Sequence, residues 1–219
     1  MKKIILLGAI LLSTSAQAEE TYTLDTQKGV VIAGDEKIHD DTSYRDLERK
    51  KLAKQFDGAL NAGEGTCQLG TKIFRGSPKE LEVVWKDSPT VPCYVKSDHD
   101  WRSFKAPSFA RITRSDSVWK TDSGIRIGTT LEELEKISGG SVGFIGMGWD
   151  YGGACCMGDF SKHIGFTVDV DEKIFENKSD ASEYYLKHLM GDKRIESKDI
   201  PADIKKKLNI TVKEIILNF

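Results

Sequence analysis

The sequence predicts an α+β protein in which an antiparallel sheet has helices packed on one face. Short strand-like segments separated by turn residues recur along the chain. Helical segments with recognisable cap residues lie between them, and strand-like segments follow each capped helix. The chain has 219 residues, which is enough for one large domain or two small ones with a hydrophobic core.

The N-terminus has the pattern of a secretory signal peptide over residues 1–18. A lysine pair precedes the apolar run Ile4–Leu12, and a stretch of small and polar residues then ends at Ala16–Ala18. The apolar run is too short to anchor the chain across a bilayer. We expect cleavage after Ala18 and a soluble mature chain, Glu19–Phe219, in the periplasm or outside the cell, without membrane insertion.

The first helix is expected after the short apolar run Val30–Ile32. Thr42 or Ser43 is its candidate N-cap, and Asp57–Gly58 marks its end. Between these positions lies a loose apolar stripe of Tyr44, Leu47, Leu52 and Phe56. Residues 59–65 are expected to form a flexible loop.

A hairpin is predicted next, because two strand-like segments flank a turn. The segments are Leu69–Phe74 and Leu81–Lys86, and the turn residues are Arg75–Pro78. Two prolines within Ser88–Pro92 end the hairpin. Residues 94–109 show no clear period and are expected to be mostly loop.

If the chain is exported, its four cysteines can form disulfides, because disulfides persist in an oxidising compartment. The hairpin would bring Cys67 and Cys93 together, and this pairing is favoured; on the chain-entropy model it would contribute about 3.5 kcal/mol. Cys155 and Cys156 would then form a strained vicinal pair or remain two free thiols. Alternatively, these two neighbours reach back to Cys67 and Cys93 and join the two halves of the chain.

The second helix has the clearest signals in the chain, after short strands expected at residues 110–115 and 124–127. A capping box is predicted in which the Thr129 hydroxyl accepts a backbone hydrogen bond and Glu132 reaches back to another N–H. Gly139–Gly140 supply a left-handed stop. The expected apolar face consists of Leu131, Leu134 and Ile137.

The C-terminal part is expected to contain two strands and a third helix. Residues 164–170 alternate as a strand, and the third helix runs from Asp180 to Gly191 with a core face of Ala181, Tyr184, Tyr185 and Leu189. The apolar residues of the last strand change phase along it; they are Ile210, Val212, Ile215, Leu217 and Phe219. A β-bulge near Lys213–Glu214 would keep them all on the core side.

The order of signals around the first two helices indicates a tandem repeat of a helix-plus-sheet unit. In each case a glycine precedes a capped helix, a glycine stop follows it, and strand-like segments with Trp85 or Trp149 come next. The expected division is a first α+β half, residues 19–109, and a second half, residues 110–219. Because any two capped helices give similar signals, one continuous domain is the alternative.

One stretch of the second half resembles a motif set of secreted bacterial proteins of unknown function. The motif reads WKTxxGIxIGTTLxELE, over Trp119–Glu135, followed by GWDYGG, over Gly148–Gly153. The closing strand Ile215–Phe219 is similar too, whereas the two adjacent cysteines do not belong to the pattern. This resemblance implies a shared fold and compartment only.

More distantly, the glycine-containing strand, the Thr-capped short helix and its glycine stop are similar to a known repeating unit. That unit occurs in β-lactamase-inhibitor proteins and in the small lipoprotein of the outer-membrane barrel-assembly machine. The resemblance implies protein binding rather than catalysis, and it carries no binding residue across.

Composition and motifs argue against several classes of function. A net charge of −2 provides no concentrated basic face for nucleic acid or an anionic membrane. Gly139–Gly143 has the letters G-x-S-x-G, but it follows a helix, whereas a nucleophile elbow lies between a strand and the next helix. The histidines His39, His99, His163 and His188 have no metal-binding spacing. We therefore expect no catalytic residue, metal or cofactor.

The loop from Met147 to Met157 is the preferred recognition site, with Met147, Trp149, Asp150 and Tyr151 as candidate binding residues. Its aromatic side chains anchor a partner at low entropic cost, and its glycines allow close backbone approach. An aromatic residue in a glycine-rich turn is also often packed on its own sheet, and this alternative stays open.

The resulting hypothesis is a non-catalytic binding or inhibitor-like protein that recognises another envelope or secreted protein. The alternative is an envelope enzyme or a thiol-redox protein that uses Cys155 and Cys156. Redox catalysts generally space their thiols as C-x-x-C, which these adjacent residues do not.

Overall fold

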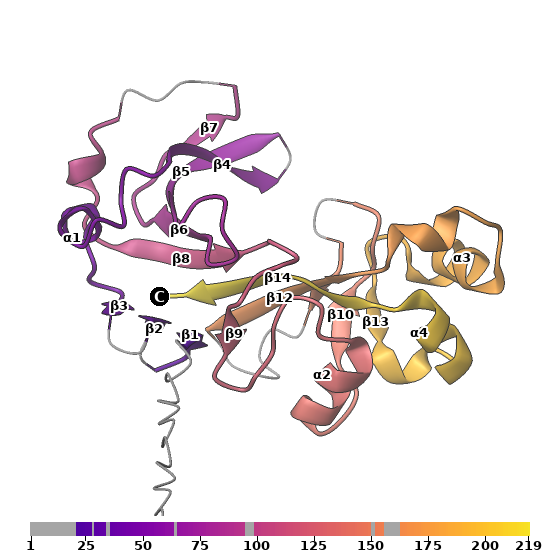
Figure 1. The fold of residues 1–219 in the computed structure, drawn as a ribbon. Coiled ribbons are helices and arrows are strands. Elements are labelled where there is room, and N and C mark those ends of the chain that lie inside the picture. Colours follow the sequence, from indigo (N-terminus) through magenta and orange to yellow (C-terminus); the bar gives the residue numbers. More distant parts are fainter. Residues whose placement is uncertain are drawn as a thin grey trace, which may run out of the picture.

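The computed structural model describes residues 21–27, 29–33, 36–63, 65–94, 99–149, 152–155 and 163–219. The signal peptide predicted for residues 1–18 lies outside these ranges. Within them, the fold is α+β, with two mainly antiparallel sheets and four α-helices (Figure 1). No helix in the described ranges is long and apolar enough to cross a membrane.

The larger sheet contains ten described strands and forms the centre of the molecule. Nine of them follow one another in the order β13-β10-β11-β12-β14-β8-β6-β5-β4, and β7 pairs with β5. Their bounds are β4 (Asp57–Gly63), β5 (Thr66–Ile73), β6 (Leu81–Trp85), β7 (Thr90–Pro92), β8 (Pro107–Ile112), β10 (Gly143–Ile145), β11 (Ala154–Cys155), β12 (Ile164–Asp169), β13 (Arg194–Glu196) and β14 (Thr211–Asn218). All of its pairings are antiparallel, as the sequence predicts.

The smaller sheet comes mainly from the N-terminal part of the described chain. Its strands lie in the order β3 (Glu36–Ile38), β2 (Gly29–Ile32), β1 (Tyr22–Asp25) and β9 (Lys120–Thr121). The β1–β9 pairing is parallel, which the long connection between these two strands allows.

Each half of the chain contains a helix followed by four strands that are neighbours in the large sheet. Helix α1 (Tyr44–Arg49) precedes the neighbouring strands β4, β5, β6 and β8, and helix α2 (Leu131–Ser138) precedes the neighbouring strands β10, β11, β12 and β14. The last strands of the two runs, β8 and β14, pair at the middle of the sheet. The predicted boundary between residues 109 and 110 therefore falls within β8.

One face of the large sheet is covered by the helices and the small sheet. Tyr44 and Leu47 of α1, Leu131 and Leu134 of α2, and the apolar residues of the small sheet all belong to one buried cluster. Alternate residues of the large sheet complete this cluster, among them Trp85, Ile112, Phe166, Ile215 and Leu217. The opposite phase of each strand therefore points away from this core.

Helices α3 (Asp180–Tyr184) and α4 (Ala202–Leu208) lie at the β13 end of the sheet (Figure 1). The predicted third helix is confirmed at its start, but it becomes a π-helical segment at Tyr185–Leu189. Helix α4 and strand β13 do not follow from the sequence pattern, because both are short. In α4, only Ile204 and Leu208 are buried, and the lysines between them obscure the apolar periodicity.

The first helix is shorter than the sequence predicts. Ser43, one of its two candidate caps, accepts from the Asp46 amide in a capping box, but the helix ends at Arg49 rather than near Gly58. Lys51 and Lys54 both have positive φ, 59° and 67°, which an α-helix does not allow. The apolar Leu52 is nevertheless buried. The apolar stripe therefore predicts which residues are in the core, but it does not predict where the helix ends.

Three segments of the sheet differ from their predictions. Residues 59–65, expected as a loop, largely belong to β4, and Ser88–Pro92 contains β7; both strands pair with β5. Residues 124–127, expected as a strand, make no strand ladder. The glycine and proline content that suggested loops reflects edge strands, which tolerate these residues.

The second helix is confirmed, but its cap lies one residue later than predicted. Thr130, not Thr129, accepts from the backbone N–H of Glu133, and the Glu133 carboxylate accepts from the Thr130 amide. Gly139 supplies the left-handed stop at φ 77°. The Thr129 hydroxyl accepts instead from the Arg126 amide, and Ile137 is 42% exposed rather than buried.

The predicted bulge in the last strand is confirmed. In the β12–β14 pairing, Thr167 lies opposite Glu214 and Val168 opposite Val212, so Lys213 is the additional residue. This insertion changes the phase of the strand and keeps both Val212 and Ile215 buried.

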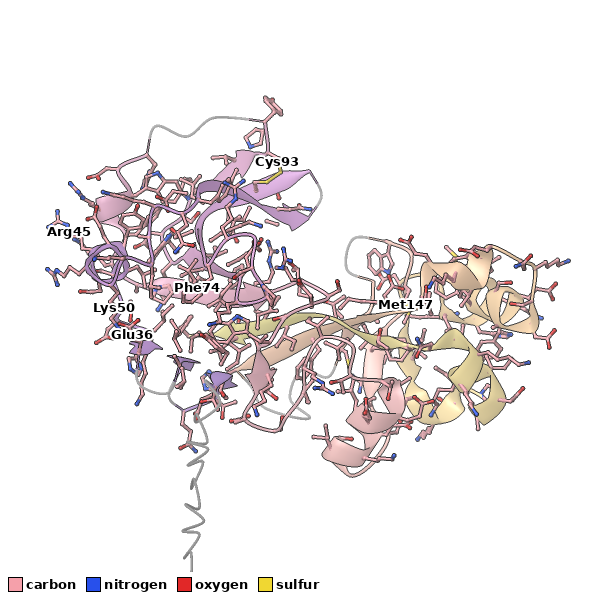
Figure 2. All side chains as sticks on the ribbon, in the orientation of Figure 1. Glu36, Arg45, Lys50, Phe74, Cys93 and Met147 are labelled. Carbon is pink, nitrogen blue, oxygen red and sulfur yellow. A yellow bond between two sulfur atoms is a disulfide. The ribbon has the colours of Figure 1, made fainter. Side chains whose placement is uncertain are left out.

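The favoured disulfide, Cys67–Cys93, is confirmed (Figure 2). It joins β5 to the residue after β7, with 26 residues of separation. This pairing rules out the alternative in which Cys67 and Cys93 join the two halves of the chain.

Candidate functional site

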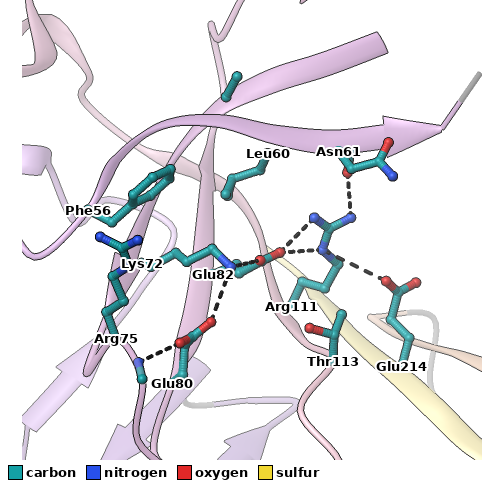
Figure 3. Close-up of a pocket in the computed structure, with 12 residues that line it drawn as sticks. Phe56, Leu60, Asn61, Lys72, Arg75, Glu80, Glu82, Arg111, Thr113 and Glu214 are labelled. Carbon is teal, nitrogen blue, oxygen red and sulfur yellow. Dashed lines mark hydrogen bonds and ion pairs between the residues drawn. The ribbon is translucent and has the colours of Figure 1, made fainter. Parts of the chain in front are cut away.

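The face of the large sheet that points away from the core is curved into a trough. Arg111 on β8 donates from Nη1 to the backbone oxygen of Asn61 on β4, at 2.8 Å. Two strands, β5 and β6, separate β4 from β8 in the sheet. The sheet must therefore curl strongly for these residues to meet, and β4 forms one wall of the trough (Figure 3).

The trough contains two hollows that share part of their lining. The first has a volume of about 600 Å³ and lies against Phe56, Lys72, Glu80 and Glu82. The second has a volume of about 620 Å³ and extends over Gln68, Phe109, Thr167 and Ile216. The shared lining consists of Asn61, Arg111, Thr113 and Glu214.

A row of alternating charges crosses the first hollow from strand to strand (Figure 3). Lys72 on β5 contacts Glu80 at 3.1 Å and Glu82 at 2.7 Å. Glu82 on β6 in turn contacts Arg111 on β8 at 2.6 Å, and Arg111 lies 3.8 Å from Glu214 on β14. The side chains of Glu82 and Arg111 are only 8% and 13% exposed, so these charges depend on one another rather than on water.

The charges at the Lys72 end of the row are well compensated. Burial alone would raise the pKa of Glu80, but the Gly76 amide and the Lys72 ammonium hold this pKa below its ordinary value. Burial likewise works against the Lys72 charge, and Glu82 and Glu80 raise the pKa of Lys72 above its ordinary value. Both groups are therefore firmly ionised at neutral pH.

Glu214 ends the row and is less well compensated. Burial raises the pKa of its carboxyl above the ordinary value, although the Arg111 charge and a hydrogen bond from the Thr167 hydroxyl act in the opposite direction. The Glu82 charge adds to the rise. Glu214 thus carries a charge that its surroundings only partly stabilise.

Beneath the charges, small and apolar residues form the floor of the trough. Leu60 and Val84 are 4% and 1% exposed, although neither belongs to the main core cluster. A Cβ at Gly70 would clash with Leu60 and would lie 2.8 Å from the backbone oxygen of Val83. The glycine therefore lets the β4 wall close over β5.

The predicted recognition loop forms part of the opposite wall. Gly152 and Ala154 line the second hollow, and the Gly152 amide donates to the backbone oxygen of Trp149. Trp149 is 40% exposed, and its indole N–H donates to the backbone oxygen of Gly146 at 2.8 Å.

Met147, another predicted binding residue, is only 1% exposed and lies in the core, so its side chain is not on the surface of the loop. Asp150 and Tyr151 lie outside the described residues.

Cys155 is buried in the sheet, at 1% exposed, and is disulfide-bonded. Cys156 lies outside the described residues.

The described part of the chain contains no group of three or more His, Cys, Asp or Glu side chains placed to hold a metal ion. His39 and His163 line a separate hollow of about 280 Å³ near the C-terminus. His99 instead stacks on Phe104, with ring centroids 4.5 Å apart.

Comparisons with family models, with curated proteins and with solved structures found no match for this chain.

Proposed function

We propose that the chain is an exported, non-catalytic binding protein that recognises another envelope or secreted protein, and that the trough is its recognition surface. The observation that carries this proposal is the open, concave sheet face with a row of ion-paired, largely buried charges. Ordered charges of this kind favour one partner over others, because an unmatched partner leaves them unpaired.

The extent of the trough favours a protein partner over a small molecule. Its lining comes from β5, β6, β8, β14 and β12, which are successive neighbours. Neighbouring strands lie about 4.8 Å apart, so this lining extends about 19 Å along the curved sheet. A loop or an extended segment of another protein fits such a surface.

The position of the recognition loop supports the same surface. Because Gly152 and Ala154 line the second hollow, the loop chosen from the sequence and the trough found in the structure adjoin one another. The Cys67–Cys93 disulfide is compatible with an oxidising compartment, where an envelope or secreted partner would be met.

Affinity capture with matched variants tests the proposal. The parent chain Glu19–Phe219 is compared with Thr113→Trp, which places a bulky ring where the two hollows meet. Lys136→Trp is the control, because Lys136 is exposed on α2, on the covered side of the sheet. Baits are exposed to envelope and culture fractions, and captured proteins are quantified by mass spectrometry.

We expect one stoichiometric partner with the parent and with Lys136→Trp, and its loss with folded Thr113→Trp. Retention of the partner by Thr113→Trp would contradict the trough as its site. Loss on Trp149→Ala alone would restrict recognition to the loop.

A further inference from the structure

The outer edge of β4 is open. Within the described ranges, β4 pairs with β5 alone and ends the large sheet. The Lys72 amide donates to the Phe56 backbone oxygen at 2.9 Å, and residues that hydrogen-bond to one neighbour alternate along an antiparallel strand. The backbone groups of Asp57, Ala59 and Asn61 therefore point away from β5, toward the free edge.

Contacts on both strands agree with this alternation. The Asn61 backbone oxygen accepts from Arg111 rather than from β5. The amide of Leu69, which lies opposite Ala59, donates to the Ser88 hydroxyl on the other side of β5. Among the residues that the structure describes, none hydrogen-bonds the edge N–H or the edge oxygen of Ala59.

The open edge borders the first hollow of the trough. Ala59 and Asn61 line this hollow, although their side chains lie in the opposite phase of the strand from Leu60 on the trough floor. They reach the hollow through their backbone, as the Asn61 oxygen does in Figure 3. The unpaired backbone groups of Ala59 are therefore accessible from the trough.

This edge is weakly protected against pairing with another chain. Sheets usually protect their edges with lysines, prolines or bulges. Residues 58–63 contain no charged residue and no proline, and the irregularity of the β4–β5 pairing lies beyond Asn61. Small residues such as Gly58 and Ala59 also allow another backbone to approach closely. The regular part of β4 is therefore a template for a further strand.

We propose that an extended, proline-free segment of the partner protein adds to β4 as a further strand of the large sheet. Its backbone donates to and accepts from Ala59, and alternate side chains enter the first hollow. A single segment fits this place, whereas a second copy of the chain would bring the sheet behind its own β4 into the trough. This inference rests on the proposed function, since it names how the trough holds its partner.

Selected peptides test the inference without the natural partner. A phage-displayed library of random linear peptides is selected against the chain Glu19–Phe219, and the strongest binder is synthesised. Each of its backbone N–H groups is methylated in turn, and affinities are measured by fluorescence polarisation. Ala59→Pro removes the edge N–H of the chain, and Ala59→Ser, which keeps this N–H, is the matched control.

We expect a period of two in the methylation series, because a strand bonds its neighbour through alternate residues. Methylation at every second peptide residue should weaken binding about tenfold, and the intervening positions should tolerate it. Folded Ala59→Pro should also bind about tenfold more weakly, whereas Ala59→Ser should bind like the parent. In the parent, the bound peptide should slow hydrogen exchange of the Ala59 amide.

The inference is overturned if no linear peptide is enriched, if the methylation series shows no period of two, or if folded Ala59→Pro binds as well as the parent. The methylation series uses the parent chain, so it decides the question even where Ala59→Pro does not fold. Since capture with Thr113→Trp tests the surface independently, a wrong binding mode is distinguishable from a wrong surface.

Discussion

At the scale of single residues, a polar chain within the core connects α1 to the sheet. The Trp85 indole N–H donates to the Thr71 hydroxyl at 3.1 Å, and this hydroxyl donates to Asp57 at 2.9 Å. The Tyr44 hydroxyl donates to the other Asp57 oxygen at 2.6 Å. Burial and the Asp57 carboxylate raise the pKa of Tyr44 well above its ordinary value, so the phenol stays a donor at neutral pH.

Removing the Thr71 hydroxyl from this series of hydrogen bonds should lower the free energy of unfolding. Thr71→Val leaves the buried indole N–H and an Asp57 oxygen without their partner, and we expect a loss of about 2–3 kcal/mol in the free energy of unfolding. Thr71→Ser keeps the hydroxyl and should lose only about 1 kcal/mol. Urea unfolding measures both variants, and an equal or greater loss for Thr71→Ser would contradict the role of the hydroxyl.

Glycine 70 offers a test of how the trough closes. Gly70→Ala should lose about 1–3 kcal/mol, because its methyl group would meet Leu60 and the Val83 backbone. Gly165→Ala is the matched control on β12, since no atom lies within 4 Å of a Cβ there. Its effect should stay within about 0.5 kcal/mol. Chemical denaturation that shows equal effects would contradict the close packing at Gly70.

Single residues also show the limits of the sequence. Periodicity predicts Leu131 and Leu134 as buried, and both are. It does not show that Met147 lies in the core, because the surrounding glycines remove the pattern. Each charged residue of the row lies at a polar position of an alternating strand, namely Lys72, Glu82, Arg111 and Glu214. Any sheet with an exposed face would have polar residues at such positions. Only the strand order, which the sequence does not provide, shows that they meet.

At the scale of elements, helix α2 illustrates how local signals work. Consecutive threonines provide two possible caps, and sequence alone does not separate Thr129 from Thr130. In the structure, the Leu131 amide donates to the backbone oxygen of Ile210, the residue before β14, and the helix begins at Leu131. The bulge of β14 could be predicted, because five apolar residues in two phases require it.

The cap of α2 should give a pH-dependent contribution to stability. Hydrogen bonds from the Thr130 amide and hydroxyl lower the pKa of Glu133. A lowered carboxyl pKa stabilises the folded chain above the unfolded value of about 4.3, and this contribution is lost as pH falls through the lowered folded pKa. Glu133→Gln should therefore lose about 0.5 kcal/mol at neutral pH and approach the parent in acid.

Thermal unfolding between neutral and acidic pH measures this difference. Glu132→Gln is the control, because it removes a charge from the same turn but keeps the cap. A larger loss for Glu132→Gln would contradict the observed register and favour the cap predicted at Thr129.

At the scale of the whole molecule, one strand pairing joins the two halves. Strand β14 pairs with β8, the last strand of the first run of four, and with β12 of the second run. Leu217, 2% exposed, lies opposite Ala110 on one side and Ile164 on the other. We therefore expect the halves to unfold as one cooperative unit, although the tandem repeat itself stays a prediction.

Truncating Leu217 tests this cooperativity. Leu217→Ala should lose about 2–5 kcal/mol and should increase amide exchange in β6 as well as in β12. Hydrogen exchange with mass spectrometry reports both strands in one experiment. An increase confined to β12 would show that the halves unfold separately.

The curved sheet places the row of charges and the recognition loop on one surface. The central claim is that this surface binds the partner protein. The most direct measurement is hydrogen exchange of the chain Glu19–Phe219 with and without its captured partner. We predict protection on β4, β8, β14 and residues 152–155, which border the trough. Protection confined to α1, α2 and the small sheet would contradict the claim, because these elements cover the opposite face.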